Sequence, residues 1–184
     1  MIEPFAKRDH EKMREVLMSP DSPGPDIYYY MIRGGSDKRN ITVWEPGTIG
    51  GEYIKAYGHY HVGDLEEVYT VLEGEGIIIL QSPIINGGIE SFKAIKVKAG
   101  DKVHIPKNTG HLAINIGKSW LVTSDDSPVN LEEKDPVSLP GHADYEPFRK
   151  MKGAAYYVVE KNGKPILVKN PSYQTVPKAN METL

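Results

Sequence analysis

The chain has no cysteine among its 184 residues, and its apolar stretches are short. The absence of cysteine excludes a disulfide framework, a cysteine-ligated zinc site, an iron–sulfur cluster and a thiol nucleophile. The most apolar stretch, EGIIILQ at 75–81, is far shorter than the roughly 20 residues that a membrane-spanning helix needs. The first residues mix charges of both signs and lack the apolar centre of a signal peptide. We therefore expect a cytoplasmic protein that does not contact a membrane.

An excess of positive charge is also missing from the sequence. There are 22 Lys+Arg against 25 Asp+Glu, a formal net charge of −3, and no run of basic residues. Proteins that bind nucleic acid typically carry a basic patch, so we expect no nucleic-acid partner. The length suits one domain with a core that needs no disulfides, and we expect a single domain over 1–184.

Glycine and proline, by contrast, are frequent. The chain has 18 Gly and 14 Pro, which favours many short elements joined by tight turns. One helix is expected near the start, capped by Asp9, with Met13, Val16 and Leu17 along one face and its end before the following Ser-Pro. Residues 1–25 would then form an N-terminal helix and a linker.

From residue 27 onward the pattern predicts strands and turns, which indicate an all-β sandwich or barrel. We expect a main barrel over 27–125, a covering loop with a helical turn over 126–154, and a C-terminal hairpin and tail over 155–184. The Asn162-Gly163 pair is a strong hairpin signal, because both residues tolerate positive φ. The predicted strands are Ile27–Ile32, Asn40–Trp44, Glu52–Tyr57, Glu67–Leu72, Gly76–Gln81, Ser91–Lys96, Lys102–Ile105, His111–Ile116, Trp120–Ser124, Ala155–Glu160 and Pro165–Val168.

Histidines and acidic residues gather around three of these strands. His59 and His61 are two residues apart, so in extended backbone their imidazoles project from the same face. Glu66 and Glu67 follow shortly after, and His111 begins a later strand. Because the chain has no thiolate, a metal would be held by imidazole nitrogen and carboxylate oxygen, a donor set that suits iron(II), nickel, manganese or zinc. On its own, a His-x-His pair is more often a pair of surface or hydrogen-bonding histidines.

The run GHYHVGDLEEVYTVLEGEG at 58–76, followed by GDKVHIPKNTGHLAIN at 100–115, resembles the two motifs of the cupin superfamily. In the first motif a glutamate is followed by six residues and a glycine, as Glu67 is followed by Gly74. The spacing of the second motif, from glycine through proline and histidine to asparagine, is met by Gly100, Pro106, His111 and Asn115. This resemblance implies an all-β cupin fold, a double-stranded β-helix or jelly-roll barrel, here with a short N-terminal helix and additional flanking strands.

The match departs from the general cupin pattern at three points. Tyr53 stands where a glycine is expected six residues before the first histidine, and Asn108 where one is expected two after the proline. The gap between the second histidine and the glutamate is one or two residues longer than usual, which leaves Glu66 as a rival ligand. We prefer Glu67 for its distance to the following glycine, and because it shares a strand face with Tyr69.

A closer resemblance covers most of residues 42–171. The segments TVWEPGTIGGEYIKAYGHYH, EVYTVLEGEGIIILQ, GHADY and VVEKNGKPILVKNP are similar to archaeal cupin-type glucose-6-phosphate isomerases, which share the longer His-to-Glu spacing. The resemblance implies a cytoplasmic homodimer with one divalent metal per subunit that interconverts glucose 6-phosphate and fructose 6-phosphate. It ranks Fe²⁺ first, with Zn²⁺, Ni²⁺ or Mn²⁺ as alternatives. The metal ligands that it implies are His59, His61, Glu67 and His111.

The same resemblance implies contacts with the sugar phosphate. Thr42 and Gly58 match positions that contact the phosphate, and Tyr69 matches a tyrosine at the sugar. A further phosphate-contacting threonine of the family is Ala56 here. The nearby Lys55 is therefore a candidate donor to the phosphate.

His142 and Tyr145 match the histidine and tyrosine of a Gly-His-Asp-Tyr segment, which has one extra residue in this chain. We expect His142 to assist opening of the sugar ring, since imidazole titrates near neutrality. Glu67 is the candidate base for moving a proton between C1 and C2, while a hydride shift would need no base. Side activity on mannose 6-phosphate would fit either route.

Two other functions remain open at this point. A cupin dioxygenase would use the same His/Glu ligands and consume O₂. A non-catalytic sugar-phosphate-binding cupin would bind its ligand without turnover, since one fold hosts many functions.

Overall fold

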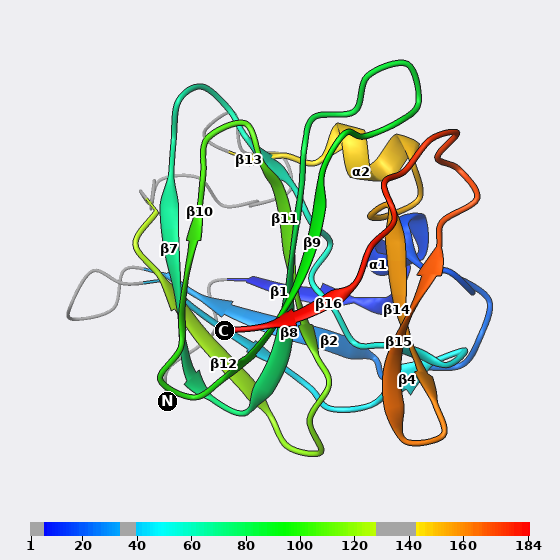
Figure 1. Ribbon diagram of the computed structural model, residues 1–184. Coiled ribbons are helices and arrows are strands. Elements are labelled where there is room, and N and C mark those ends of the chain that lie inside the picture. Colours follow the sequence, from blue (N-terminus) through cyan, green and yellow to red (C-terminus); the bar gives the residue numbers. More distant parts are fainter. Residues whose placement is uncertain (1–5, 34–39, 128–142) are drawn as a thin grey trace.

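The computed structural model describes residues 6–33, 40–127 and 143–184, and the all-β class with a cupin arrangement is confirmed. In these residues the strands form four sheets, of which two make up the barrel walls and two lie beside them (Figure 1). The helices are short: α1 (His10–Met13), the 3₁₀ turn η1 (Arg14–Val16) and α2 (Glu146–Lys150). The strands are β1 (Ala6–Asp9), β2 (Ile27–Ile32), β3 (Asn40–Trp44), β4 (Thr48–Ile49), β5 (Glu52–Tyr53), β6 (Tyr60–His61), β7 (Glu67–Glu73), β8 (Glu75–Gln81), β9 (Phe92–Lys98), β10 (Lys102–Ile105), β11 (Gly110–Asn115), β12 (Leu121–Asp125), β13 (Ala143–Asp144), β14 (Tyr156–Lys161), β15 (Lys164–Lys169) and β16 (Met181–Thr183).

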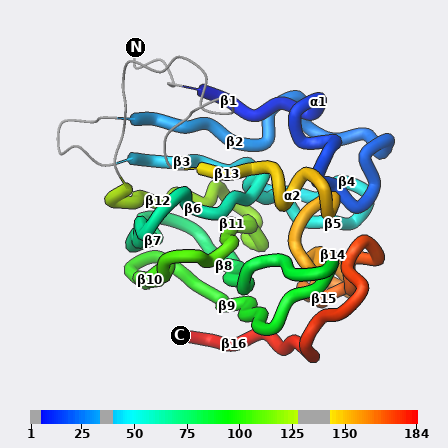
Figure 2. The backbone as a smooth tube through the Cα atoms, turned by 90° about the horizontal axis from the view of Figure 1, so that it is seen from above, coloured from blue at the N-terminus to red at the C-terminus, as the bar shows by residue number. Residues whose placement is uncertain are grey.

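The two main sheets form the walls of the barrel. One has the order β1-β2-β3-β12-β7-β10, and the other has the order β11-β8-β9-β16. Figure 2 shows β1, β2 and β3 on one side of the molecule, and β8, β9 and β16 on the other. Side chains such as Trp44 and Val71 from the first sheet belong to the same core as Ile78 and Leu112 from the second. The interior between the sheets is therefore where inward-facing polar side chains would form a site.

The N-terminal helix is confirmed. The Asp9 side chain accepts a hydrogen bond from the Lys12 backbone N–H at 2.9 Å, which is the N-cap interaction expected from the sequence. Met13, Val16 and Leu17 are buried as predicted. The strand β1, which precedes the helix and pairs antiparallel with β2, was not predicted.

The C-terminal hairpin is also confirmed. Asn162 and Gly163 both have positive φ, 53° and 73°, and they join β14 to β15. Gly74, the glycine of the first motif, has a φ of 85°, and a Cβ there would lie 2.4 Å from the Trp120 carbonyl oxygen. Only glycine fits this tight junction between β7 and β8. Asn115, the asparagine of the second motif, donates to the carbonyls of Trp44, Glu45 and Ser119, so its role is structural.

The strand predicted at Glu52–Tyr57 is wrong in its second half. Only Glu52–Tyr53 pairs with β4, and the chain then crosses to run along β11 in the second main sheet. Backbone hydrogen bonds mark this crossing, from Asn115 N to Ile54 O at 2.8 Å and from Ala56 N to Ala113 O at 2.8 Å. We call residues 54–61 the crossing segment, because it brings the His-x-His pair beside β11.

The covering loop predicted over 126–154 contains regular structure where it is described. β13 pairs with β6, so that Ala143 lies opposite His61, and α2 supplies the expected helical turn. Residues 128–142 lie outside the described part of the chain. In the described residues no helix is long and apolar enough to cross a lipid bilayer.

Candidate functional site

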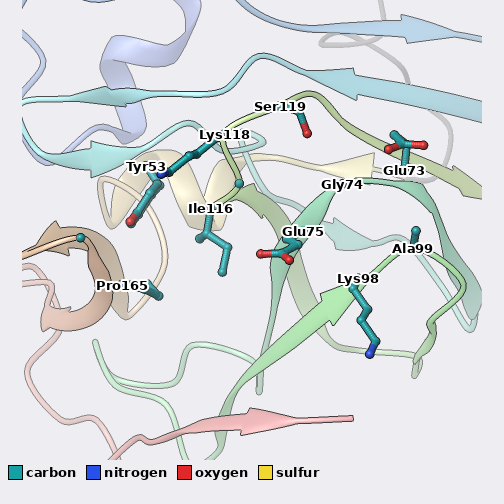
Figure 3. Close-up of a pocket in the computed structure, with 12 residues that line it drawn as sticks. Tyr53, Glu73, Gly74, Glu75, Lys98, Ala99, Ile116, Lys118, Ser119 and Pro165 are labelled. Atoms are coloured by element: carbon teal, nitrogen blue, oxygen red, sulfur yellow. The ribbon is translucent and has the colours of Figure 1, made fainter.

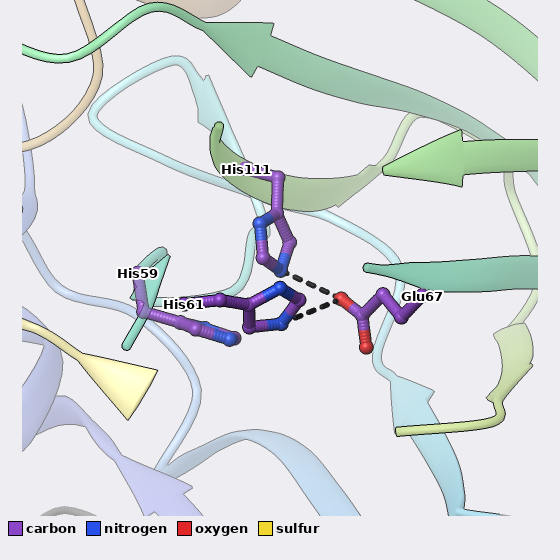
Figure 4. Close-up of side chains that lie close together, drawn as sticks. All are labelled: His59, His61, Glu67 and His111. Carbon is purple, nitrogen blue, oxygen red and sulfur yellow. Dashed lines mark ion pairs between the residues drawn. The ribbon is translucent and has the colours of Figure 1, made fainter. Parts of the chain in front are cut away.

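Four of the predicted metal ligands meet inside the barrel. His59 and His61 come from the crossing segment, Glu67 from the first position of β7, and His111 from the second position of β11. One ligand atom from each of the four residues lies within 4.8 Å of the others. Figure 4 shows the three imidazoles and the carboxylate directed toward one another. Residues far apart in the sequence thus form one N₃O cluster.

Backbone pairing fixes the relative positions of the histidines. His59 and His111 form an antiparallel bridge, with hydrogen bonds from His59 N to His111 O at 3.2 Å and from His111 N to His59 O at 3.0 Å. Their ring centroids are 4.3 Å apart. His61 is held from its other side by β13. The cluster therefore rests on sheet structure, which positions side chains more precisely than a free loop does.

Hydrogen bonds also set the tautomers of two imidazoles. Nδ1 of His61 lies 3.2 Å from the Leu65 carbonyl oxygen, and Nδ1 of His111 lies 3.1 Å from the Thr109 carbonyl oxygen. A carbonyl only accepts hydrogen bonds, so each Nδ1 carries a proton. In the neutral rings Nε2 then presents a lone pair to the centre of the cluster, as in a metal-binding histidine.

Glu67 completes the cluster and is 4% exposed. Its Oε1 lies 2.8 Å from Nε2 of His111 and 3.3 Å from Nε2 of His61. Burial would raise the pKa of Glu67, but hydrogen bonds and positive charge from the surrounding histidines outweigh burial and hold this pKa well below its usual range. The donor set and its charge therefore fit a divalent metal ion.

The structure distinguishes between the two adjacent glutamates. Glu66 points out of the barrel, where its carboxylate lies 3.1 Å from Nε2 of His104. Both of these side chains are about half exposed, at 48% and 55%. Glu67, on the opposite face of the chain, lies in the cluster, as the sequence spacing predicted.

Two of the predicted substrate residues lie beside the cluster, and a third is buried in the barrel wall. The Tyr69 ring centroid is 5.7 Å from that of His111, and the Tyr145 ring centroid is 5.4 Å from that of His59. Thr42 is 7% exposed and lies on the buried face of β3, like Asn40 and Trp44. Its cross-strand neighbour is Thr123 of β12. Burial raises the pKa of both tyrosines, so their hydroxyls remain protonated donors at neutral pH.

Gly58 lies directly before His59 and has a backbone conformation that favours glycine. Its φ is 87°, and a Cβ at this position would lie 2.8 Å from the Phe148 ring of α2. The crossing segment thus passes so close beneath α2 that only glycine fits. His142, the predicted ring-opening residue, lies outside the described residues.

The proposal that Lys55 contacts a phosphate is wrong. This lysine is 3% exposed, and its Nζ forms an ion pair with Glu52 and donates to the Val16 carbonyl oxygen at 2.6 Å. Its ammonium also lies 5.0 Å from the centre of the Tyr157 ring. Lys55 therefore holds the N-terminal segment against the barrel, and its buried ammonium is committed to these protein groups.

Sequence reasoning missed three charged residues of the interior. Arg8 is 3% exposed and lies on the inner face of β1, opposite Tyr29. Arg33 directly follows β2 and continues the alternation that turns Tyr29 and Met31 inward. Its Nη1 is 3.5 Å from Thr42 Oγ1. Asp125, at the end of β12, is 9% exposed. The inward parity of Arg33 in the predicted strand was a usable signal, whereas Arg8 gave none because β1 was not predicted.

A pocket of about 700 Å³ lies at the other end of the barrel strands (Figure 3). Gly74 at the end of β7 and Ile116 beyond β11 line it, whereas the cluster occupies the first residues of these strands. Its charged lining mixes Glu73 and Glu75 with Lys98 and Lys118. None of the predicted site residues belongs to this pocket.

Comparison with known families gives one match that covers most of the chain. The model of the family described as glucose-6-phosphate isomerase (GPI) matches residues 30–175. The glucose-6-phosphate isomerase of Thermococcus litoralis is 35% identical over 134 residues, which are 72% of this chain and 62% of that protein. That of Pyrococcus horikoshii is 29% identical over 169 residues, which are 90% of this chain and 81% of that protein. The chain thus spans less than two thirds of the length of the first of these relatives.

Solved structures with a similar course of the chain include an oxalate oxidase, with a TM-score of 0.41 and 16% identity over 53% of this chain and 48% of that one. The cupin domain of Drosophila melanogaster CENP-C has a TM-score of 0.41 and 14% identity, over 61% of this chain and 79% of that one.

Proposed function

The chain belongs to the glucose-6-phosphate isomerase family, and from this premise we propose that it interconverts glucose 6-phosphate and fructose 6-phosphate with the help of a divalent metal. The observation that carries the proposal is the meeting of three imidazoles and one carboxylate inside the barrel of a chain whose residues 30–175 match this family. His59, His61, Glu67 and His111 would hold the metal.

The donor set suits several divalent ions. Three nitrogens and one oxygen accept Fe²⁺, Zn²⁺, Ni²⁺ or Mn²⁺, and we propose Fe²⁺ as the first choice. When bound, the ion supplies a Lewis acid that polarises the oxygens at C1 and C2 of the sugar.

The residues of the chain would then move hydrogen between C1 and C2. Glu67 turns one oxygen toward the histidines, and Figure 4 shows its second oxygen directed away from them. We propose that this second oxygen takes the proton from C2 and returns it at C1. The hydroxyls of Tyr69 and Tyr145 would orient the sugar, and His142 would assist ring opening.

Thr42 and Gly58 would contact the phosphate. The Thr42 hydroxyl faces the interior, where it can donate a hydrogen bond to a phosphate oxygen. The Gly58 backbone, which leads into His59, would place its N–H near the same end of the site.

We further propose a cytoplasmic homodimer. The outer face of the six-stranded sheet supports it, because cross-strand neighbours there are apolar: Tyr30 lies opposite Val43, and Val43 lies opposite Val122. Leu72 and Trp120 are each 43% exposed. We call these five residues the outer apolar face, and a second copy of the chain could cover it.

The test is a coupled assay with the purified full chain. Fructose 6-phosphate is supplied together with a glucose-6-phosphate dehydrogenase that reports product as NADPH, after loading with Fe²⁺, Zn²⁺, Ni²⁺ or Mn²⁺ in turn. We expect NADPH formation with at least one metal, and in D₂O the proton route predicts deuterium in the product. The absence of NADPH with all four metals would overturn the isomerase assignment. Tight sugar-phosphate binding without turnover would favour a binding protein, and substrate-dependent oxygen uptake would favour a dioxygenase.

A further inference from the structure

We propose that Arg8 and Arg33 form the cationic part of the substrate site and bind the phosphate group of the sugar phosphate. The inference rests on the proposed function and extends it, since neither arginine belongs to the residues that sequence similarity places at the site. Arg8 comes from β1, and Arg33 directly follows β2, the neighbour of β1 in the six-stranded sheet. The chemistry that they recognise is a dianionic phosphate monoester.

The Tyr145 hydroxyl lies beside Arg8, which donates a hydrogen bond to it. Burial raises the pKa of Tyr145, and the charges of Arg8 and Arg33 act against that effect. The other side of the Tyr145 ring faces His59, at 5.4 Å between ring centroids. Tyr145 therefore links Arg8 to the metal cluster.

Arg33 also reaches a residue proposed to bind substrate. Its Nη1 lies 3.5 Å from the Thr42 hydroxyl. The same nitrogen lies 3.2 and 3.4 Å from the carbonyl oxygens of Ile32 and Ile41, which orient the guanidinium. A phosphate in contact with Arg33 would then also contact Thr42.

The charges of the interior match this ligand. Arg8 and Arg33 contribute two positive charges, and Glu67 and Asp125, when ionised, contribute two negative ones. A divalent metal in the cluster would leave an excess of two positive charges among these groups. A phosphate dianion carries the two negative charges that neutralise this excess.

Lys55 does not supply the cation of this site. It lies four residues before His59 and is committed to Glu52 and the Val16 carbonyl. A guanidinium also suits the role better than an ammonium, because its planar donors match two phosphate oxygens at once.

The test compares Arg33→Gln with Arg14→Gln in the full chain. Arg14 is an exposed arginine whose ion pairs with Asp21 and Glu11 lie on the surface, so it is the matched control. Isothermal titration with inorganic phosphate measures binding without turnover. We expect Arg33→Gln to weaken phosphate binding about tenfold to a hundredfold, the usual effect of a lost hydrogen bond to a charged group. Arg14→Gln should bind phosphate as the unaltered chain does.

Kinetics give the second measurement. Arg33→Gln should raise KM for fructose 6-phosphate much more than it lowers kcat, with an unchanged metal content and an unchanged melting temperature. Arg8→Lys keeps the buried charge but loses the planar donors, so it should weaken phosphate binding in the same direction.

The outcomes separate this inference from the proposed function. If Arg33→Gln binds phosphate as tightly as the unaltered chain, or the unaltered chain binds none, the assignment of the arginines is wrong. If phosphate binding falls in Arg33→Gln but the unaltered, metal-loaded chain forms no glucose 6-phosphate, the anion site stands and the isomerase proposal fails.

Discussion

At the scale of single residues, the site depends on which way adjacent side chains point. Glu66 and Glu67 are neighbours in sequence, yet one pairs with His104 at the surface and the other lies among buried histidines. The alternation of faces in extended backbone produces this difference. Two nearly identical carboxylates therefore have different roles, which makes them a matched pair for experiment.

Replacing Glu67 with glutamine should remove the only carboxylate of the cluster in the described chain. We expect Glu67→Gln to weaken metal binding at least about tenfold, since even groups that only support metal ligands cost 10- to 100-fold when they are removed. Metal content after dialysis, measured by mass spectrometry, checks this. Glu66→Gln is the control and should retain the metal. Equal retention in both variants would show that Glu67 is not a ligand.

The sequence predicted which residues form the cluster but only some of the polar residues around it. Motif spacing identified all four cluster residues, because the cupin pattern constrains each position along the chain. Arg8 was missed because a strand of four residues with mostly polar side chains has no apolar alternation to reveal it. Lys55 was misassigned because its burial depends on a long-range contact with the Val16 carbonyl, which the local sequence does not reveal.

At the scale of elements, the crossing segment determines the site. Residues 54–61 leave β5, run along β11 and deliver the His-x-His pair beside His111. The strands β2, β3 and β10 have the predicted bounds, since each is a clear run of strand-forming residues. The two-residue strands β4, β6 and β13 were not predicted. Each is too short to show a sequence pattern and is a strand only because it pairs with a neighbouring segment.

Gly58 tests how closely the crossing segment and α2 must pack. Gly58→Ala introduces a Cβ into the Phe148 ring and strains a φ of 87°. Gly63→Ala is the matched control, since its φ of 75° is similar but no heavy atom lies within 4 Å of its Cβ position. Backbone strain of about 1–3 kcal/mol applies to both, so only Gly58→Ala should carry an additional packing cost.

The measurement is chemical denaturation of both glycine variants. We expect a lower free energy of unfolding for Gly58→Ala than for Gly63→Ala, accompanied by weaker metal binding because His59 is displaced. Equal stability of the two variants would contradict the close packing of α2 on the crossing segment.

At the scale of the whole molecule, the inward and outward faces of the barrel sheets have different proposed roles. The inward faces hold the cluster and the arginines, and the outward face of the six-stranded sheet is the outer apolar face. The division of the chain into helix with linker, barrel, covering loop and hairpin remains a prediction. The family match over residues 30–175 extends over the barrel, the covering loop and part of the hairpin and tail.

The outer apolar face predicts the oligomeric state. Leu72→Glu would place two like charges in a symmetric interface, and we expect the dimer dissociation constant to rise at least about tenfold. Ile85→Glu is the control, because Ile85 is 61% exposed in the turn that its bridge with Gly88 closes, away from that face. Sedimentation equilibrium distinguishes dimer from monomer. A Leu72→Glu variant with unchanged mass would contradict the proposed interface.

The central claim is that a divalent metal, held by three histidines and Glu67, is needed for isomerisation. Metal analysis of the purified chain, followed by chelation, reconstitution and the coupled assay, tests it most directly. The account predicts about one metal ion per chain, loss of NADPH formation on chelation, and recovery when Fe²⁺ or one of the alternative ions is returned. Full isomerase activity in the chelated, metal-free chain would contradict it.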